Sequence, residues 1–377
     1  MAETGSHPGR DTTLRKKVLV VGATGVVGLA AMRRFARQGV ETLAVSRRRP
    51  RQTYGAEHVA LDLLDRDATK ALAATHPDIT HVVYAALYEQ PGLIAGWLEA
   101  EQMATNERML SNLLEPLLAG SGPLAHVTLL QGTKAYGAHV RPIDLPARED
   151  RSEHVHDNFY WLQEAFIREQ ASGMPWCWTI LRPQIIFGDA TGVAMNLIPV
   201  LGAYGAVLRA EGAPLHFPGG EGGVLEAVDA DLLAEVIDWA GSAAAAQDQI
   251  FNVTNGDVFA WRSVWPAIAD ALGMPVGEDR PMSVAALLAN AAPTWRAIAT
   301  EHELIEPDLE RLLGESHHYA DFTMAYGFDG GAPPPALVST IKLRRAGFHG
   351  VIDTELMFRK WIAVLQQERL LPGRSGS

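Results

Sequence analysis

The sequence lacks the features that would direct it to a membrane or stabilise it outside the cell. Among its 377 residues there is one cysteine, Cys177, so the chain can form neither an internal disulfide nor a thiolate metal cluster. No apolar run reaches the roughly 18 residues needed to span a membrane, and the polar residues 1–17 are unlike a signal peptide. We therefore expect a cytoplasmic protein in which Cys177 is a buried strand residue.

Positive charge is also scarce. The chain has 32 Lys and Arg residues against 44 Asp and Glu, for a formal net charge of −12 and a pI near 5.5. Nucleic acids and anionic membranes are bound by clustered Lys and Arg, so neither is expected as a partner. A small molecule is the better expectation. Hydrophobic residues make up 47% of the chain, which suffices for one large core and a smaller second lobe.

Apolar runs of strand length alternate with helix-like segments through the first half of the chain. Lys17–Val21 is rich in β-branched residues, and Leu29–Gln38 then has apolar and charged residues at helical spacing. Further strands are expected at Thr42–Ser46, His58–Leu61, Thr80–Tyr84, Val127–Gln131 and Trp176–Arg182, with helices at Trp97–Leu114 and Phe159–Ser172. This alternation predicts an α/β fold with a doubly wound parallel sheet of the Rossmann type.

The regularity ends after Gly188, which suggests two main parts. We expect a disordered tail at 1–14, a nucleotide-binding domain at 15–188 and a mostly helical substrate lobe at 189–377. Residues 190–223 are rich in glycine and proline between apolar segments and are predicted to leave the sheet as part of the substrate lobe. Residues 225–255 are predicted to return to the first domain, with a helix at Val228–Trp239 and a strand at Ile250–Val253. Later helices are expected at Trp261–Leu272 and Thr354–Leu370.

A glycine-rich turn follows the first predicted strand. Its residues Gly22, Thr24, Gly25, Val26, Val27 and Gly28 form a GxxGxxG pattern that leads into the first helix. Glycines permit the tight turn and the close approach of backbone to a pyrophosphate, and the helix N-terminus adds partial positive charge. Because the pattern lies directly after an apolar strand, we expect it to bind a dinucleotide.

The end of the second strand indicates which dinucleotide. An acidic residue there would bind both ribose hydroxyls of NAD, whereas arginine binds the 2′-phosphate of NADP. The chain has Ser46, Arg47 and Arg48 at this point, followed by Arg49. Guanidinium groups bind phosphate bidentately, so NADPH is the expected cofactor. Asp62 and Leu63, after the third strand, are expected near the adenine.

The usual catalytic pair of short-chain dehydrogenases, a tyrosine with a lysine four residues later, is missing. Tyr160 lies in a plausible helix, but Glu164 occupies the position of the lysine. Lys134 follows the fifth predicted strand instead. Ligands of doubly wound sheets bind at the carboxyl ends of the strands, so Lys134 and Tyr160 are expected to reach the same crevice.

With these motifs the chain resembles the progesterone 5β-reductase and iridoid synthase-like family, which are atypical extended short-chain reductases. The resemblance lies in the Gly22 turn, Ser46–Arg48, Gln131–Tyr136, Asn158–Tyr160, Arg182–Gly188, Phe217–Gly219, Asp229–Ala234, Phe251–Trp261, Ala346–Phe348 and Asp353–Thr354. It implies reduction of an enone by hydride transfer from NADPH to the β-carbon, with Tyr160 stabilising the enolate oxygen and Lys134 holding the cofactor or lowering the tyrosine pKa.

The resemblance also implies further contacts with cofactor and substrate. The expected cofactor contacts, besides those named, are Ala85, Ala86, Gln131, Gly132, Pro183, Ile185 and Ile186. The expected substrate contacts are Tyr136, Tyr204 and Tyr319, the last in a segment, 317–322, that closes over the substrate in the family. His317 and His318 would make this pocket more polar than is usual. No third metal ligand accompanies them, so we expect no metal.

Three functions remain open from the sequence. The favoured one is an NADPH-dependent enone reductase. The second is a carbonyl reductase or a sugar-nucleotide epimerase or dehydratase that uses the same tyrosine and lysine. The third is a non-catalytic NADP-binding regulator, which the missing tyrosine–lysine spacing would suit. The substrate, the proton donor to the α-carbon and the oligomeric state, including a homodimer, are left open. Leu197, Ile198, Val200, Leu201 and Val207 line either a pocket or an interface between lobes.

Overall fold

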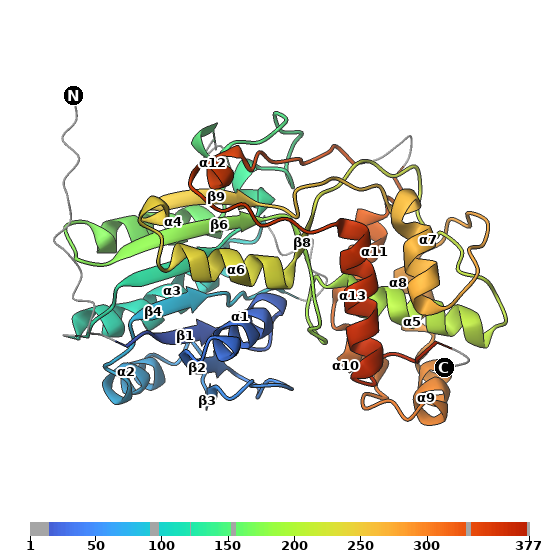
Figure 1. The fold of residues 1–377 in the computed structure, drawn as a ribbon, viewed down its shortest axis with the longest axis horizontal. Coiled ribbons are helices and arrows are strands. Elements are labelled where there is room, and N and C mark those ends of the chain that lie inside the picture. Colours follow the sequence, from blue (N-terminus) through green and yellow to red (C-terminus); the bar gives the residue numbers. More distant parts are fainter. Residues whose placement is uncertain (1–14, 91–97, 121, 152–155, 329–332, 375–377) are drawn as a thin grey trace.

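The structure, a computed structural model, describes residues 15–90, 98–120, 122–151, 156–328 and 333–374 (Figure 1). The predicted tail at 1–14 falls outside these residues. Seven parallel strands form the main sheet in the order β3-β2-β1-β4-β5-β6-β9. Their bounds are β1 Lys17–Val21, β2 Glu41–Ser46, β3 Glu57–Ala60, β4 His81–Tyr84, β5 His126–Leu130, β6 Cys177–Pro183 and β9 Gln249–Val253. The doubly wound sheet is therefore confirmed.

Helices cover both faces of this sheet. They are α1 Val26–Arg37, α2 Arg66–Thr75, α3 Ala100–Ala119, α4 Phe159–Ala171 and α6 Ala230–Ala240. Side chains of one strand point alternately to opposite faces, so Val18 and Val20 pack with α1 and α6 while Leu19 and Val21 pack with α2, α3 and α4. Both faces are thus buried, which explains why the strands are continuously apolar. Cys177 is buried in β6, and its thiol donates to the Ala125 carbonyl (3.5 Å).

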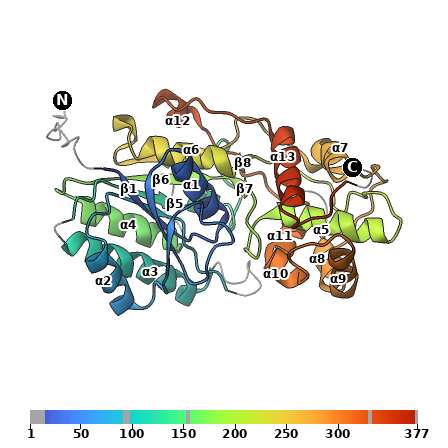
Figure 2. The same ribbon diagram turned by 60° about the horizontal axis from the view of Figure 1, so that its bottom comes forward.

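The remaining helices gather at one end of the molecule, beside the sheet, as both views show (Figures 1 and 2). They are α5 Leu197–Ala210, α7 Trp261–Leu272, α8 Val284–Ala289, α9 Ala292–Glu301, α10 Leu309–Leu313, α11 Ser316–Thr323 and α13 Thr354–Gln367. A small parallel pair, β7 Ile185–Phe187 with β8 Ala227–Asp229, lies between the two parts. The short helix α12 Ile341–Arg345 lies against β9. Within the described part of the chain, no helix is both long and apolar enough to cross a membrane.

The second half contains one helix that the sequence pattern did not predict and one whose start it misplaced. Residues 190–223, which were expected to leave the sheet, contain the fourteen-residue helix α5. The helix continues through Gly202 and Gly205, where a Cβ would lie 2.2 Å from Leu371 and 2.8 Å from Leu272, respectively. These glycines instead allow neighbouring side chains to approach closely. The helix predicted from Val228 begins later, because Val228 belongs to β8 and the Asp229 carboxylate caps α6.

Candidate functional site

The glycine turn lies at the carboxyl edge of the sheet, where the strand order reverses between β1 and β4. Gly22 has a φ of +87°, and its N–H donates to the Val45 carbonyl (2.9 Å). A Cβ on Gly22 would lie 2.7 Å from the carbonyl carbon of Ala85, and one on Gly28 would lie 2.3 Å from the Gly22 oxygen. Both positions therefore require glycine. Since Gly25 caps α1 without a side chain, the first N–H groups of this helix can bind an anion.

The loop after β2 presents guanidinium groups to solvent. Arg47, Arg48 and Arg49 are exposed, while Ser46 is buried and its hydroxyl donates to the Arg48 carbonyl (2.7 Å). This bond fixes the turn that carries the arginines. Asp62 is exposed after β3, where its carboxylate accepts from the Leu64 N–H (3.0 Å). The exposed guanidinium groups at this edge are available to an anionic ligand.

Tyr160 lies in the first turn of α4, and neighbouring amides hold it there. The helix is capped by Asn158, whose Oδ1 accepts from the Tyr160 N–H (3.0 Å) and whose Nδ2 donates to the Lys134 carbonyl (3.1 Å). Gln131 Nε2 donates to the Tyr160 carbonyl (3.1 Å). A Cβ on Gly132 would lie 3.5 Å from the Tyr160 hydroxyl. The structure therefore brings Gln131, Gly132 and the backbone of Lys134, after β5, together with the start of α4, which carries Tyr160.

Lys134 lies in a 3-10 turn, Thr133–Tyr136, directly after Gly132. Its Nζ is 3.4 Å from Oε1 of Glu89, and both side chains are largely buried. Burial lowers the pKa of Lys134 to about 8, although the charge of Glu89 opposes this shift. Burial and the charge of Lys134 also lower the pKa of His139 to about 4, so this imidazole is neutral at physiological pH.

The environment of Tyr160 keeps its phenol protonated. Burial raises its pKa above the ordinary value; Glu89 and Tyr319 raise it further, and the guanidinium of Arg182 lowers it. The net shift is opposite to the lowering that a nearby ammonium was expected to cause. A protonated, buried hydroxyl is a hydrogen-bond donor, and that is the form needed to stabilise a developing oxyanion.

Glu164, at the position of the usual lysine, is buried and binds two arginines. Its Oε2 accepts from Arg182 (3.2 Å) and its Oε1 from Arg168 (2.8 Å). Arg182 is fully buried at the end of β6, whereas the side chain of Arg168 is half exposed. This carboxylate therefore joins α4 to the sheet.

The three predicted substrate tyrosines lie in different places. Tyr319, on α11, is half buried, and its proximity raises the pKa of Tyr160. Tyr136 is buried, and its hydroxyl donates to Asn252 Oδ1 (2.6 Å). Tyr204 is buried in α5 and donates to the His216 carbonyl (3.0 Å). Its neighbours Leu197, Ile198, Val200, Leu201 and Val207 belong to the same packed core of the helical part.

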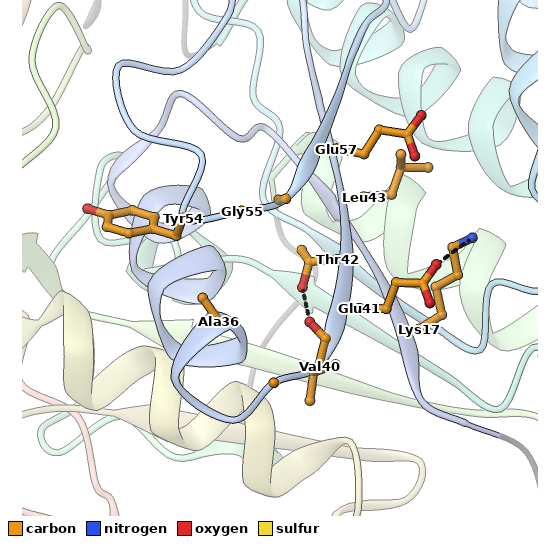
Figure 3. Close-up of a pocket in the computed structure, with 11 residues that line it drawn as sticks. Lys17, Ala36, Val40, Glu41, Thr42, Leu43, Tyr54, Gly55 and Glu57 are labelled. Carbon is orange, nitrogen blue, oxygen red and sulfur yellow. Dashed lines mark hydrogen bonds and ion pairs between the residues drawn. The ribbon is translucent and has the colours of Figure 1, made fainter.

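A cavity of about 290 Å³ lies at the opposite edge of the sheet (Figure 3). It is lined at the amino ends of three strands by Lys17, Glu41 and Glu57, and Figure 3 shows Lys17 paired with Glu41. Ligands of parallel sheets bind at the carboxyl ends, so we do not assign this cavity to the site. Among the described residues, no three His, Cys, Asp or Glu side chains are grouped so that they could hold a metal ion.

Sequence reasoning did not assign roles to Glu89 or Arg182. Both follow or end strands at the carboxyl edge, which is the one signal that would have identified them. Their burial and their partners depend on tertiary packing. Arg182 belongs to a segment that resembles the family, but its contacts with Gln131 and Glu164 follow only from the structure.

Comparisons with known proteins give both a fold and a family. The family described as "NAD dependent epimerase/dehydratase family" matches residues 18–199. Among solved structures, a UDP-glucose 4-epimerase from Thermotoga maritima with UDP-glucose has a TM-score of 0.65 at 14% identity, over 93% of this chain and 99% of that one. A Thermus thermophilus UDP-glucose 4-epimerase in complex with NAD has a TM-score of 0.62 at 17% identity, over 92% and 98%. At these identities the likeness shows the fold.

Sequence relatives are more similar. An (S)-8-oxocitronellyl enol synthase of Nepeta racemosa is 30% identical over 94% of this chain and 92% of that protein. A 3-oxo-Delta(4,5)-steroid 5-beta-reductase of Arabidopsis thaliana is 29% identical over the same shares. The alignment with each relative spans both the sheet and the helical part.

Proposed function

We propose that this chain reduces activated C=C bonds with NADPH. It belongs to the progesterone 5β-reductase and iridoid synthase-like family of extended short-chain dehydrogenases/reductases. Membership makes the chain an oxidoreductase. The substrate we propose is a small-molecule enone, reduced by hydride addition at its β-carbon. The observation that carries this proposal is the buried, protonated Tyr160 hydroxyl beside Gly132, with Lys134 displaced to the neighbouring turn.

The carboxyl edge of the sheet supports NADPH as the cofactor. The backbone approach at Gly22 and Gly28 leaves room for a pyrophosphate, and the open N-terminus of α1 favours its charge. Arg47 and Arg48 would bind the 2′-phosphate, with Asp62 and Leu63 near the adenine. The remainder of the cofactor would be bordered by Ala85, Ala86, Gln131, Gly132, Pro183, Ile185 and Ile186. Bound nicotinamide would supply the hydride.

Tyr160 and Lys134 would have different tasks in this reaction. Addition of hydride at the β-carbon places negative charge on the enone oxygen, and the Tyr160 hydroxyl would donate a hydrogen bond to that atom. Lys134 would hold the ribose hydroxyls through its ammonium, which Glu89 orients. Tyr319 on α11 would cover the substrate from the helical part. The α-carbon would then take its proton from water.

The second candidate function is direct reduction of a carbonyl, or epimerisation of a sugar nucleotide. The match to the epimerase/dehydratase family and the fold of the two UDP-glucose 4-epimerases favour it. Against it, Glu164 replaces the lysine that usually accompanies the tyrosine. The third candidate function is that of a non-catalytic NADP-binding regulator. The burial of both Tyr160 and Lys134 at the carboxyl edge of the sheet weighs against it.

Product analysis distinguishes the three. Purified protein with NADPH is incubated with small and bulky enones, beside matched saturated ketones and aldehydes. We expect saturated ketone from the enone and no reduction of the saturated controls. Alcohol as the product would move the protein to the second function. NADPH that binds tightly but is not consumed with any compound would favour the regulator.

A further inference from the structure

Arg182 is a buried charge that the proposed reaction does not use directly. It is the penultimate residue of β6, with an exposed fraction of 0%, and its guanidinium lies over the rings of Tyr136 (5.0 Å) and Trp161 (5.6 Å). Its Nε donates to Gln131 Oε1 (2.9 Å), and its Nη2 donates to Glu164 Oε2 (3.2 Å). A guanidinium at this depth must be paired, because removing it from water is costly.

Both acceptors are connected to α4, the helix that carries Tyr160. Gln131 uses its other amide atom, Nε2, to hold the Tyr160 carbonyl (3.1 Å). Glu164 lies one turn further along the same helix, α4. Arg182 therefore connects α4 to the ends of β5 and β6 at two residues: Glu164 directly and, through Gln131, Tyr160, the proposed hydrogen-bond donor.

We propose that Arg182 is a positioning residue for Tyr160, acting through Gln131 and Glu164. The inference rests on the proposed function in that Tyr160 is the group being positioned. The buried guanidinium also acts on the phenol through space, since its charge lowers the pKa of Tyr160 against the larger effect of burial. Displacing a catalytic group by even 1 Å lowers the reaction rate by a large factor. Contacts that fix the position of this helix therefore affect the rate.

Arg168 provides a matched control. It also binds the Glu164 carboxylate, at Oε1 (2.8 Å), but from the same helix and with its side chain half exposed. Its guanidinium also lies over the ring of Trp178 on β6 (4.6 Å), but both of its hydrogen bonds go to Glu164. The two arginines therefore share one carboxylate partner and differ in that Arg182 also binds Gln131, which holds the Tyr160 carbonyl.

The experiment compares Arg182→Lys, Glu164→Gln and Arg168→Gln in the full-length protein. We expect Arg182→Lys to lower kcat by about 10- to 100-fold, with Glu164→Gln lowering it less. The Kd for NADPH should change by less than about threefold, because neither side chain is placed at the cofactor. Arg168→Gln should keep kcat within about twofold. Equal kcat values in Arg182→Lys and wild type, or equal losses in Arg182→Lys and Arg168→Gln, would overturn the proposal.

A readout without turnover separates this proposal from the proposed function. In protein labelled at the tyrosine ζ-carbon, the Tyr160 resonance is assigned by its loss in Tyr160→Phe. It should shift in Arg182→Lys and Glu164→Gln and stay in place in Arg168→Gln. An unmoved Tyr160 signal in the first two variants would refute the positioning role. If the wild type reduces carbonyls in place of enones, the proposed function fails, and the same kcat comparison on that substrate still tests Arg182.

Discussion

The Tyr160 hydroxyl is one oxygen atom, and its removal tests the proposed mechanism directly. Tyr160→Phe keeps the ring that packs against Phe159 and removes only the donor. We expect turnover to fall by about 10²–10³ while NADPH binding is retained, since the loss is limited to stabilisation of the oxyanion. Steady-state kinetics and a titration of NADPH fluorescence measure the two quantities. Full activity of Tyr160→Phe on every accepted substrate would refute the mechanism.

Lys134 predicts a pH dependence at the same site. Its pKa of about 8 means that the ammonium is present below that pH and is lost above it. We therefore expect kcat/KM, which reports the free enzyme, to fall as the pH rises through about 8. Because arginine stays charged, Lys134→Arg should remove this alkaline limb, and Lys134→Ala should weaken both NADPH binding and turnover at every pH. An identical alkaline limb in Lys134→Arg would assign the titration to another group.

The loop after β2 is the element that should select the cofactor. Arg47→Ala combined with Arg48→Ala removes two exposed guanidinium groups and leaves the Ser46 turn bond intact. We expect affinity for NADPH to fall about tenfold or more while affinity for NADH is unchanged, because only NADPH carries the 2′-phosphate. Isothermal titration with both cofactors gives the ratio. Arg37→Ala, an exposed arginine at the far end of α1, is the control. An unchanged ratio in the double variant would reject the 2′-phosphate assignment.

Elements of the fold were predictable where local pattern and tertiary packing agree. β1 and α7 have the predicted bounds, Lys17–Val21 and Trp261–Leu272, because their apolar spacing is strictly that of a strand and a helix. α5 was missed because Gly202 and Gly205 suggest a loop, although contacts with Leu371 and Leu272 explain them. Asp229 was assigned to a helix interior because its role as a cap depends on where β8 ends.

At the scale of the whole molecule, the site combines residues from distant parts of the sequence. Strands β4, β5 and β6 end at one edge of the sheet, and α11 approaches this edge from the helical part. The site there contains Glu89, Lys134, Tyr160, Arg182 and Tyr319. Sequence motifs identified Lys134 and Tyr160 and the rule for strand ends placed them together. Burial raises the pKa of Tyr160 and lowers that of Lys134, and this burial depends on packing that no motif encodes. The domain boundary at residue 188 stays a prediction.

The sheet and the helical part are connected through Arg33 on α1. Its guanidinium contacts Asp189, after β7, and Asp231 on α6, each at 2.7 Å, and lies over the ring of Trp361 on α13 (5.1 Å). The Asp189 side chain is 1% exposed. Loss of the partner of a buried carboxylate strongly destabilises the folded state, because the charge is left buried and unpaired.

We therefore expect Arg33→Met to lower the free energy of unfolding by about 3–5 kcal/mol, measured by urea denaturation. Arg34→Met is the control, since Arg34 pairs with Glu235 and Asp238 nearer the surface and should cost about 1 kcal/mol or less. Equal losses in the two variants would mean that the Arg33 contacts contribute no more than surface pairs.

The pH dependence of that difference follows from Asp231. Burial opposes its ionisation, but Arg33 and Lys360 outweigh this effect and hold the pKa of Asp231 below its ordinary value. A carboxylate with a lowered pKa stabilises the folded state above its unfolded pKa, about 3.9, and this stabilisation is lost as the pH falls through the folded pKa. Arg33→Met removes the contribution of Arg33 to this stabilisation at every pH. The gap in unfolding free energy between wild type and Arg33→Met should therefore be constant above pH about 5 and shrink below about 4. A gap that stays constant down to pH 3 would assign the stabilisation to packing of the Arg33 side chain on Trp361.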